Sequence, residues 1–141
     1  MFGKNKDRIG HTQAKIESFS TVTLRESGMR GLTEYEIVMN GENAEISFYW
    51  INYTQGKDCR ELDRRTVCGK ETVIRLLNDC NVPSWDGFVG NHPKWVLDGT
   101  SFTFNASVNQ GGKIYAHGSE NFPKHYREFV NALNNFLYGD F

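Results

Sequence analysis

The sequence predicts an α+β fold, a single-layer antiparallel sheet of about six strands with two helices packed on one face. Three observations support this prediction. Segments that alternate apolar and polar residues outnumber segments with helical spacing, and short glycine-containing turns separate most of them. The two amphipathic segments lie far apart in the sequence, so each follows its own group of strands. The predicted order of elements is ββββαββα, and a length of 141 residues is typical of one domain.

The first half of the chain is predicted to form a polar arm followed by a four-stranded meander. Residues 1–14 are polar and basic without periodicity, so we expect a flexible N-terminal arm ahead of a single α+β domain over residues 15–141. Asn40 and Gly41 form the strongest hairpin signal, because both residues tolerate positive φ. Alternation and β-branched residues predict strands over residues 16–25, 33–39, 44–53 and 60–68.

A short helix and an irregular loop are predicted next. The helix, over residues 71–80, is predicted from the i, i+3, i+4, i+7 spacing of Val73, Leu76, Leu77 and Cys80. In the loop that follows, Trp85 and Phe88 are expected to plug one end of a small core. Asp86 between them is expected to cap a local backbone group. Residues 95–97 are expected to start the next strand.

The last third of the chain is predicted to form a complete ββα unit. The first strand of the unit is predicted from the alternation of Phe102, Phe104, Ala106 and Val108 with polar residues. A glycine turn follows, and the return strand over residues 113–117 places Tyr115 and His117 on one face. The final helix is expected to begin at Pro123, because proline is favoured at the first helical position.

The glycine, proline and aromatic positions of this segment resemble those of a group of small bacterial proteins. The shared pattern is Trp85-x-Gly87-Phe88, then Asp98-Gly99-x-x-Phe102, then Gly118-x-x-x-Phe122-Pro123-x-x-Tyr126. The group is common in anaerobic Gram-positive bacteria and has no assigned activity. The resemblance covers about the last sixty residues of this chain. It implies a bacterial source and a common closing ββα segment, and it transfers no catalytic residue.

Composition argues against several classes of function. Sixteen basic and seventeen acidic residues give a formal charge of −1, whereas a nucleic-acid or anionic-membrane binder normally carries a basic excess. Three cysteines without a C-x-x-C motif, and scattered histidines, predict neither a metal site nor a catalytic cysteine–histidine pair. The first ten residues lack the apolar run of a signal peptide, and no segment is long and apolar enough to span a membrane. We therefore expect a cytoplasmic protein without a cofactor.

The best candidate site is the strand over residues 46–53, which is aromatic on both faces. Phe48 and Trp50 lie on one face, and Tyr49 and Tyr53 lie on the other. One interpretation is a central strand whose second face is covered by the linker or the N-terminal arm. The functional interpretation is a partner-binding surface, because tyrosine offers both contact area and a hydrogen bond. The candidate binding residues are Tyr35, Tyr49, Tyr53, Tyr115, His117, Arg60 and Arg64.

Three hypotheses about function follow from the sequence. The first is a small non-enzymatic protein, such as an immunity or inhibitor protein, that binds another protein through the sheet; it requires Tyr49 and Tyr53 to be exposed. The alternative is a small-molecule or peptide-binding domain, or a weak enzyme, with a pocket between the sheet and the Trp85 loop. That pocket would use Trp85, Trp95, Tyr115 and His117. The third is a homodimer formed through the aromatic strand. Arg60 and Arg64, interleaved with acidic residues, form either a solvated edge or a charged docking strip.

Overall fold

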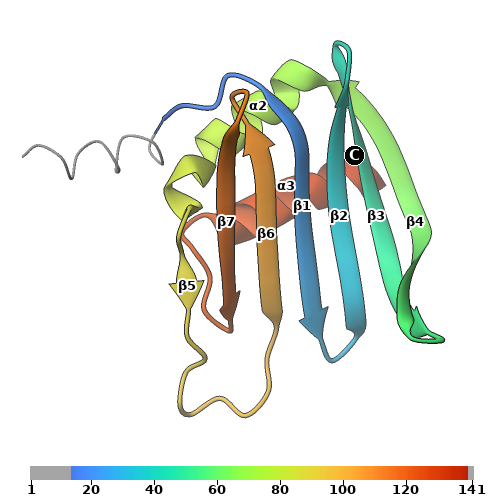
Figure 1. Cartoon of the computed structure of the whole chain (residues 1–141), viewed down its shortest axis with the longest axis vertical. Helices are drawn as coiled ribbons and strands as arrows, with labels where there is room; N and C mark the ends of the chain where they lie inside the picture. The colour runs from blue at the N-terminus through green and yellow to red at the C-terminus, as the bar shows by residue number, and fades with distance from the viewer. Residues whose placement is uncertain (1–13, 140–141) are drawn as a thin grey trace, which may run out of the picture.

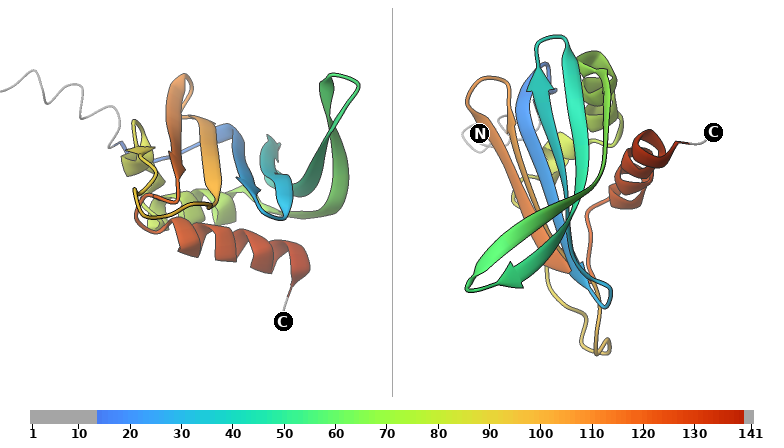
Figure 2. Two further views of the ribbon diagram at one scale, coloured as in Figure 1. Left: turned by 90° about the horizontal axis from the view of Figure 1, so that it is seen from below. Right: turned by 90° about the vertical axis from the view of Figure 1, so that its right-hand side faces the viewer.

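The computed structural model describes residues 14–139, and in that range one seven-stranded sheet carries two α-helices on one face (Figures 1 and 2). All but the last residue of the predicted arm lies outside the described residues. In chain order the elements are β1 (Phe19–Gly28), β2 (Gly31–Asn40), β3 (Asn43–Thr54), β4 (Lys57–Gly69), α2 (Lys70–Asp79), the 3₁₀ helix η1 (Val82–Trp85), β5 (Val89–Gly90), β6 (Ser101–Val108), β7 (Gly112–Ser119) and α3 (Tyr126–Tyr138).

The strand order across the sheet is β4-β3-β2-β1-β6-β7-β5. The α+β class is confirmed, as is antiparallel pairing of the four-stranded meander and of the later hairpin β6–β7, which joins it along β1. The prediction of about six strands, all antiparallel, is wrong in one respect, because β5 pairs in parallel with β7 and makes the sheet mixed. A strand of two residues shows no alternation, so the sequence gives no signal for it.

The core lies between the sheet and the two helices. Apolar side chains alternate along the strands toward the helices, and the apolar stripes of α2 and α3 close over them. Val73 and Leu77 of α2, and Phe129 and Leu133 of α3, are fully buried. Figure 2 shows both helices on the same side of the sheet. The other side of the sheet, called the open face below, carries no helix among the described residues.

The expectation that the last helix begins at Pro123 is wrong. Residues 123–125 form a turn, in which the N–H of Tyr126 donates to the carbonyl oxygen of Pro123 (3.2 Å). His125 has a φ of 70° in the left-handed region, and α3 begins only at Tyr126. Phe122 stacks on Tyr126 with ring centroids 4.7 Å apart, so the turn is itself part of the core wall. The tertiary contacts of these rings outweigh the local preference of proline for the first helical turn.

The Trp85 loop is a plug of the core, as predicted. Trp85 is only 1% exposed and meets Phe104 and Phe129 edge-on at ring-centroid distances of 5.0 and 5.5 Å. Its indole N–H donates to the carbonyl oxygen of Lys124 (3.1 Å). Asp86 accepts a hydrogen bond from the backbone N–H of Tyr115 (2.9 Å), so it caps a distant strand rather than its own turn. Because Trp85 is fully buried in the core, its ring cannot line the pocket predicted between the sheet and this loop.

Candidate functional site

The seven predicted binding residues do not form one surface. Strand pairing places Tyr49 and His117 in one row of the open face, with Glu34, Arg25 and Thr103 between them. Tyr53, Tyr115 and Arg60 also lie on that face, at other levels of the sheet. Tyr35 and Arg64 lie on the opposite face, which the helices cover. The predicted set therefore mixes residues from the two sides of the sheet.

Tyr35 belongs to the helix side because it pairs in register with Phe48. Its hydroxyl donates to Asn134 of α3 (2.7 Å). Arg64 reaches the helix side because β4 carries a β-bulge opposite Phe48 and Tyr49. In an unbroken strand Arg60 and Arg64 would share a face. With the bulge, the guanidinium of Arg64 instead stacks on the ring of Tyr138, 4.8 Å from its centroid.

Tyr49 is buried by its own chain, contrary to the requirement of the sheet-surface hypothesis. It is 7% exposed, whereas Tyr53 is 75% exposed near the tip of the same hairpin. The guanidinium of Arg60 lies over the Tyr49 ring at 4.0 Å, and Arg65 donates to its hydroxyl oxygen (3.2 Å). Both arginines come from β4, which bends with β3 away from the helices (Figure 2, right). The linker, one of the two covers that the sequence suggests, makes no part of this contact, and all but the last residue of the arm lies outside the described residues.

Charged groups on the open face are paired with one another. The carboxylate of Glu34 is nearly buried and accepts from Arg25 and Arg60, each at 3.0 Å. Arg25 also pairs with Asp58 (3.1 Å), and Arg60 with Glu36 (3.2 Å). Such mutual pairing satisfies the buried carboxylate and leaves little free charge for a partner. The interpretation of β4 as a solvated, charged edge strand fits its place at the end of the sheet.

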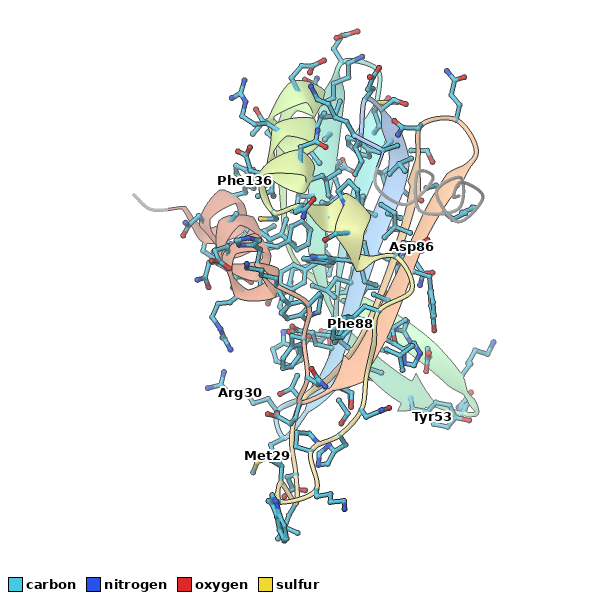
Figure 3. All side chains as sticks on the ribbon, turned by 90° about the vertical axis from the view of Figure 1, so that its left-hand side faces the viewer. Met29, Arg30, Tyr53, Asp86, Phe88 and Phe136 are labelled. Atoms are coloured by element: carbon cyan, nitrogen blue, oxygen red, sulfur yellow. The ribbon has the colours of Figure 1, made fainter. Side chains whose placement is uncertain are left out.

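Tyr115 and His117 lie beside each other on β7, with ring centroids 5.6 Å apart. Their strand is separated from β3 by β2, β1 and β6, so they do not extend the surface around Tyr53. The outer edge of β7 is occupied at this level, because the N–H of Gly87 donates to the carbonyl oxygen of Tyr115 (2.9 Å). In Figure 3, Tyr53 projects on the side away from the helices. Among the described residues, the open face thus presents its exposed tyrosines, Tyr53 and Tyr115, at two separate positions.

A groove of about 850 Å³ lies on the other side, at the end of the sheet where β1 turns into β2. Its floor is the helix-side surface of β1, β2 and β3, one wall is the last turns of α3, and the other wall is formed by residues 98–100 and Glu120. Met29 and Arg30, the exposed residues of the turn between β1 and β2, belong to the lining at its mouth, and both are labelled in Figure 3. Aromatic and acidic groups dominate the lining: Tyr35, Phe48, Trp50 and Tyr138, with Glu26, Asp98 and Glu120.

Glycines help to keep the groove open. Gly31 has a φ of +124°, which a side chain rarely tolerates, and the ring of Trp50 lies 3.8 Å from where its Cβ would stand. A Cβ on Gly99 would collide with the side chain of Glu120. Glu120 is held in that position because its carboxylate accepts from the backbone N–H of Thr100 (2.6 Å). Gly31 and Gly99 therefore leave the groove open, and the backbone N–H of Thr100 holds the Glu120 carboxylate beside it.

Three tyrosines around the groove are held in the neutral form. Burial, and then the nearby carboxylate of Glu26, raise the pKa of Tyr35 to about 12. Burial and a hydrogen bond to Asp63 raise the pKa of Tyr138 to about 12. Burial and the same Glu26, whose carboxylate accepts from its hydroxyl, raise the pKa of Tyr126 well above its usual range. These three phenols therefore stay uncharged to a higher pH than an exposed tyrosine would.

The buried phenol of Tyr35 predicts a loss of stability in alkali. Its pKa is raised from 10.0 to about 12, so the neutral form favours the fold; this contribution is complete below pH 10 and is lost as pH rises to about 12. The shift corresponds to roughly 3 kcal/mol of unfolding free energy. Between pH 10 and 12, the unfolding free energy of Tyr35→Phe should fall less than that of wild type, by about that amount. Urea unfolding at each pH measures it. Tyr53→Phe is the control and should lose stability with rising pH as wild type does. If its loss were reduced as much as that of Tyr35→Phe, the burial of the Tyr35 phenol would not be the cause.

Two large apolar side chains are exposed on the loop of residues 91–100, whose last three residues line the groove. Trp95 is 91% exposed and Leu97 is 95% exposed, and Met29 at the mouth of the groove is also exposed. Hydrogen bonds tie this loop to the corner after β7. His92 bonds to the Ser119 hydroxyl (2.7 Å), the amide of Asn121 donates to the carbonyl oxygen of Asn91 (3.2 Å), and Glu120 holds Thr100.

Sequence reasoning missed this end of the molecule. Residues 95–97 were expected to start a strand, but they form an exposed loop. Phe48 and Trp50, which the sequence places on one face of their strand, both line the groove, and Phe48 also packs against the core. The groove is open because α3 contacts β3 and β4 but leaves the ends of β1 and β2 uncovered (Figure 1). The available signal was a tryptophan and a leucine in a segment bounded by proline and Asp-Gly, where burial is not expected.

Residues 14–139 contain neither a cluster of metal ligands nor a membrane-spanning helix. No group of three or more histidine, cysteine or acidic side chains in this range is placed to hold a metal ion. Neither helix in the same range is long and apolar enough to cross a membrane. Comparison with known proteins gives no match, since no family model, no curated protein and no solved structure matches the chain.

Proposed function

We propose that this chain is a small binding protein that engages another protein through the groove and the adjacent loop of residues 91–100. This keeps the class expected from the sequence, a non-enzymatic immunity or inhibitor protein, but moves the binding surface from the open face to the groove. The observation that carries the proposal is the exposure of Trp95 and Leu97 on a hydrogen-bonded loop beside a concave surface. Exposed apolar groups at a groove are typical of interaction sites.

The energetics of association favour such an arrangement. Tryptophan is among the residues that most often contribute large parts of a binding free energy. A loop already fixed by hydrogen bonds loses little conformational entropy when a partner binds, so more of the contact energy is retained. The groove beside the loop offers depth for a partner side chain, whereas the open face offers paired charges and two isolated tyrosines.

The proposed location is the cytoplasm. Cys59, Cys68 and Cys80 are all free thiols in the fold, and unpaired cysteines are typical of reducing compartments. Burial raises the pKa of the Cys68 thiol, which disfavours the reactive thiolate. A near-neutral overall charge supports a protein partner over a nucleic acid.

The test is a comparison of two surface variants in partner capture. Wild-type protein is cross-linked to partners in an extract of the source organism, and cross-linked residues are mapped by mass spectrometry. We expect cross-links around residues 91–100, and Trp95→Ser/Leu97→Ser to lower partner recovery at least about tenfold. Tyr53→Ser/Tyr115→Ser is the matched control, because it removes exposed apolar area from the open face only.

Two results would contradict the proposal. Loss of recovery in the tyrosine control alone would return the binding surface to the open face. Equal recovery by all proteins would show that neither set of residues contacts a partner. The molar mass of each protein in solution tests whether the partner is a second copy of this chain. In that case wild type is a dimer and Trp95→Ser/Leu97→Ser is a monomer.

A further inference from the structure

We propose that the groove receives an arginine side chain of the partner, with its guanidinium between the carboxylates of the groove and the ring of Trp50. This inference rests on the proposed function and adds the chemistry of the group that is bound. It is carried by the groove itself, by charge complementarity and by the aromatic surfaces within it.

In the described part of the chain, the carboxylates that line the groove are free of ion pairs, unlike Glu34 and Glu36 on the open face. Glu26, Asp98 and Glu120 form no ion pair within 4.0 Å among residues 14–139, although all three line the same space. On the open face, by contrast, Glu34 and Glu36 are paired with arginines. Arg30 is the one cationic residue in the described lining of the groove, and Arg127 lines a smaller hollow that shares Glu26 and Glu120 with it. Acidic groups therefore outnumber basic ones there, and a cation from outside would complete the pairing.

Hydrogen bonds hold two of these carboxylates in place before any ligand arrives. Glu26 accepts from the Tyr126 hydroxyl through one oxygen, and no hydrogen bond to its other oxygen is seen among the described residues. Glu120 likewise accepts from Thr100 through a single oxygen, Oε2. A guanidinium has five N–H donors in a planar fork and pairs with carboxylates more specifically than an ammonium does.

The aromatic lining suits the flat face of a guanidinium. Trp50 is partly exposed in the groove and is held edge-on by Phe48, with ring centroids 6.0 Å apart. Tryptophan is the strongest cation–π partner among side chains. At the rim, Arg64 of this chain already stacks on Tyr138, 4.8 Å from the ring centroid. The same mode of contact is thus present at the neighbouring ring.

The size and spacing of the groove favour a peptide side chain over a metal ion. A volume of about 850 Å³ accommodates an arginine together with its flanking residues. Among residues 14–139, the carboxylates do not converge closely enough to form a metal-binding cluster. Met29 at the mouth offers a polarisable apolar contact for the neighbouring residues of a peptide.

The probe for this inference is N-acetyl-arginine amide, compared with its neutral isostere N-acetyl-citrulline amide. Both are titrated into the ¹⁵N-labelled protein, and the indole N–H signals of its three tryptophans are followed by NMR. We expect the Trp50 indole and the Thr100 amide to shift with the arginine probe, with a dissociation constant on the order of 1 mM. The citrulline probe is expected to bind at least about tenfold more weakly, and raised salt should weaken only arginine binding. The buried Trp85 indole serves as the internal control.

Isosteric variants test the carboxylates without removing their structural bonds. In Glu26→Gln/Glu120→Gln, each amide oxygen can still accept from Tyr126 and Thr100, so the fold is expected to be retained. We expect this variant to bind the arginine probe at least about tenfold more weakly than wild type. Glu34→Gln/Glu36→Gln on the open face is the control, and its affinity for the probe should equal that of wild type.

The outcomes separate this inference from the proposed function. Equal binding of both probes, or binding unaffected by Glu26→Gln/Glu120→Gln, would overturn the arginine site. If partner recovery nevertheless depends on Trp95 and Leu97, the binding surface stands and only the chemistry of its ligand is wrong. Shifts centred on Tyr53 or Tyr115 would place the cation on the open face and would also overturn the inference.

Discussion

Replacement of Trp85 by alanine is expected to remove about 3–5 kcal/mol of unfolding free energy, the range measured for large aromatic residues in cores. The indole is enclosed by Phe104, Tyr126 and Phe129, and its N–H satisfies the carbonyl oxygen of Lys124. Truncation therefore leaves both a cavity and a carbonyl oxygen without its donor. Because single domains of this size are stable by only about 5–15 kcal/mol, a large part of the total would be lost.

The matched control for this prediction is Trp95→Ala, which removes the same side chain from an exposed position. Its expected effect is within about 0.5 kcal/mol. The measurement is urea unfolding of both variants and wild type, followed by circular dichroism so that the loss of a tryptophan does not alter the signal. Similar midpoints for the two variants would contradict the assignment of Trp85 to the core.

The second large effect is expected from Gly118→Ala in β7. A Cβ at this position would overlap the backbone oxygen of Asn121 and stand 3.0 Å from a ring carbon of Phe102 and 3.1 Å from the Cα of Gly90. Two of these three neighbours are backbone atoms, so relief requires movement of the strand or of the corner that follows it. We expect a loss of about 3 kcal/mol, at the upper end of the usual cost of overpacking.

Gly69→Ala provides the control for that variant. Gly69 has a φ of −71°, and nothing lies within 4 Å of the position where its Cβ would stand. Its unfolding free energy should change by less than about 1 kcal/mol. If Gly118→Ala unfolds at the same urea concentration as Gly69→Ala, the close approach of β7 and the corner is not a constraint on the fold.

Much of the fold follows from short-range patterns in the sequence. The meander is predictable because each strand alternates, and because Asn40 and Gly41 suit a tight hairpin. The burial of Trp85 also follows from the sequence, because Trp85 and Phe88 flank a turn in the way typical of residues that close the end of a small core. Features that depend on contacts between distant segments were not. Pairing of β5 with β7 and the left-handed conformation of His125 are set by the Trp85 loop and by the rings around Tyr126.

The candidate site was harder to predict for a related reason. The alternation of side chains places Tyr49 and Trp50 on opposite faces of the strand, but it does not predict how fully a helix covers either face. The structure gives opposite answers at these neighbouring residues: Tyr49 faces the open side and is buried by arginines, whereas Trp50 faces the helix side and lines a groove. Both outcomes depend on tertiary structure. The bend of β4 brings arginines over Tyr49, and the end of α3 leaves Trp50 partly uncovered. Neither leaves a periodic signal in the chain.

The central position of β1 governs the order in which this protein can assemble during synthesis. Thr23 pairs with Glu36 on one side and with Asn105 on the other, so one edge of β1 stays unpaired until β6 has left the ribosome. Pairing between segments so far apart makes folding slow relative to a sheet of local hairpins. The groove needs still more of the chain, since its lining extends from Glu26 to Tyr138. A nascent chain that has already formed the meander therefore has no binding site until its final helix is in place.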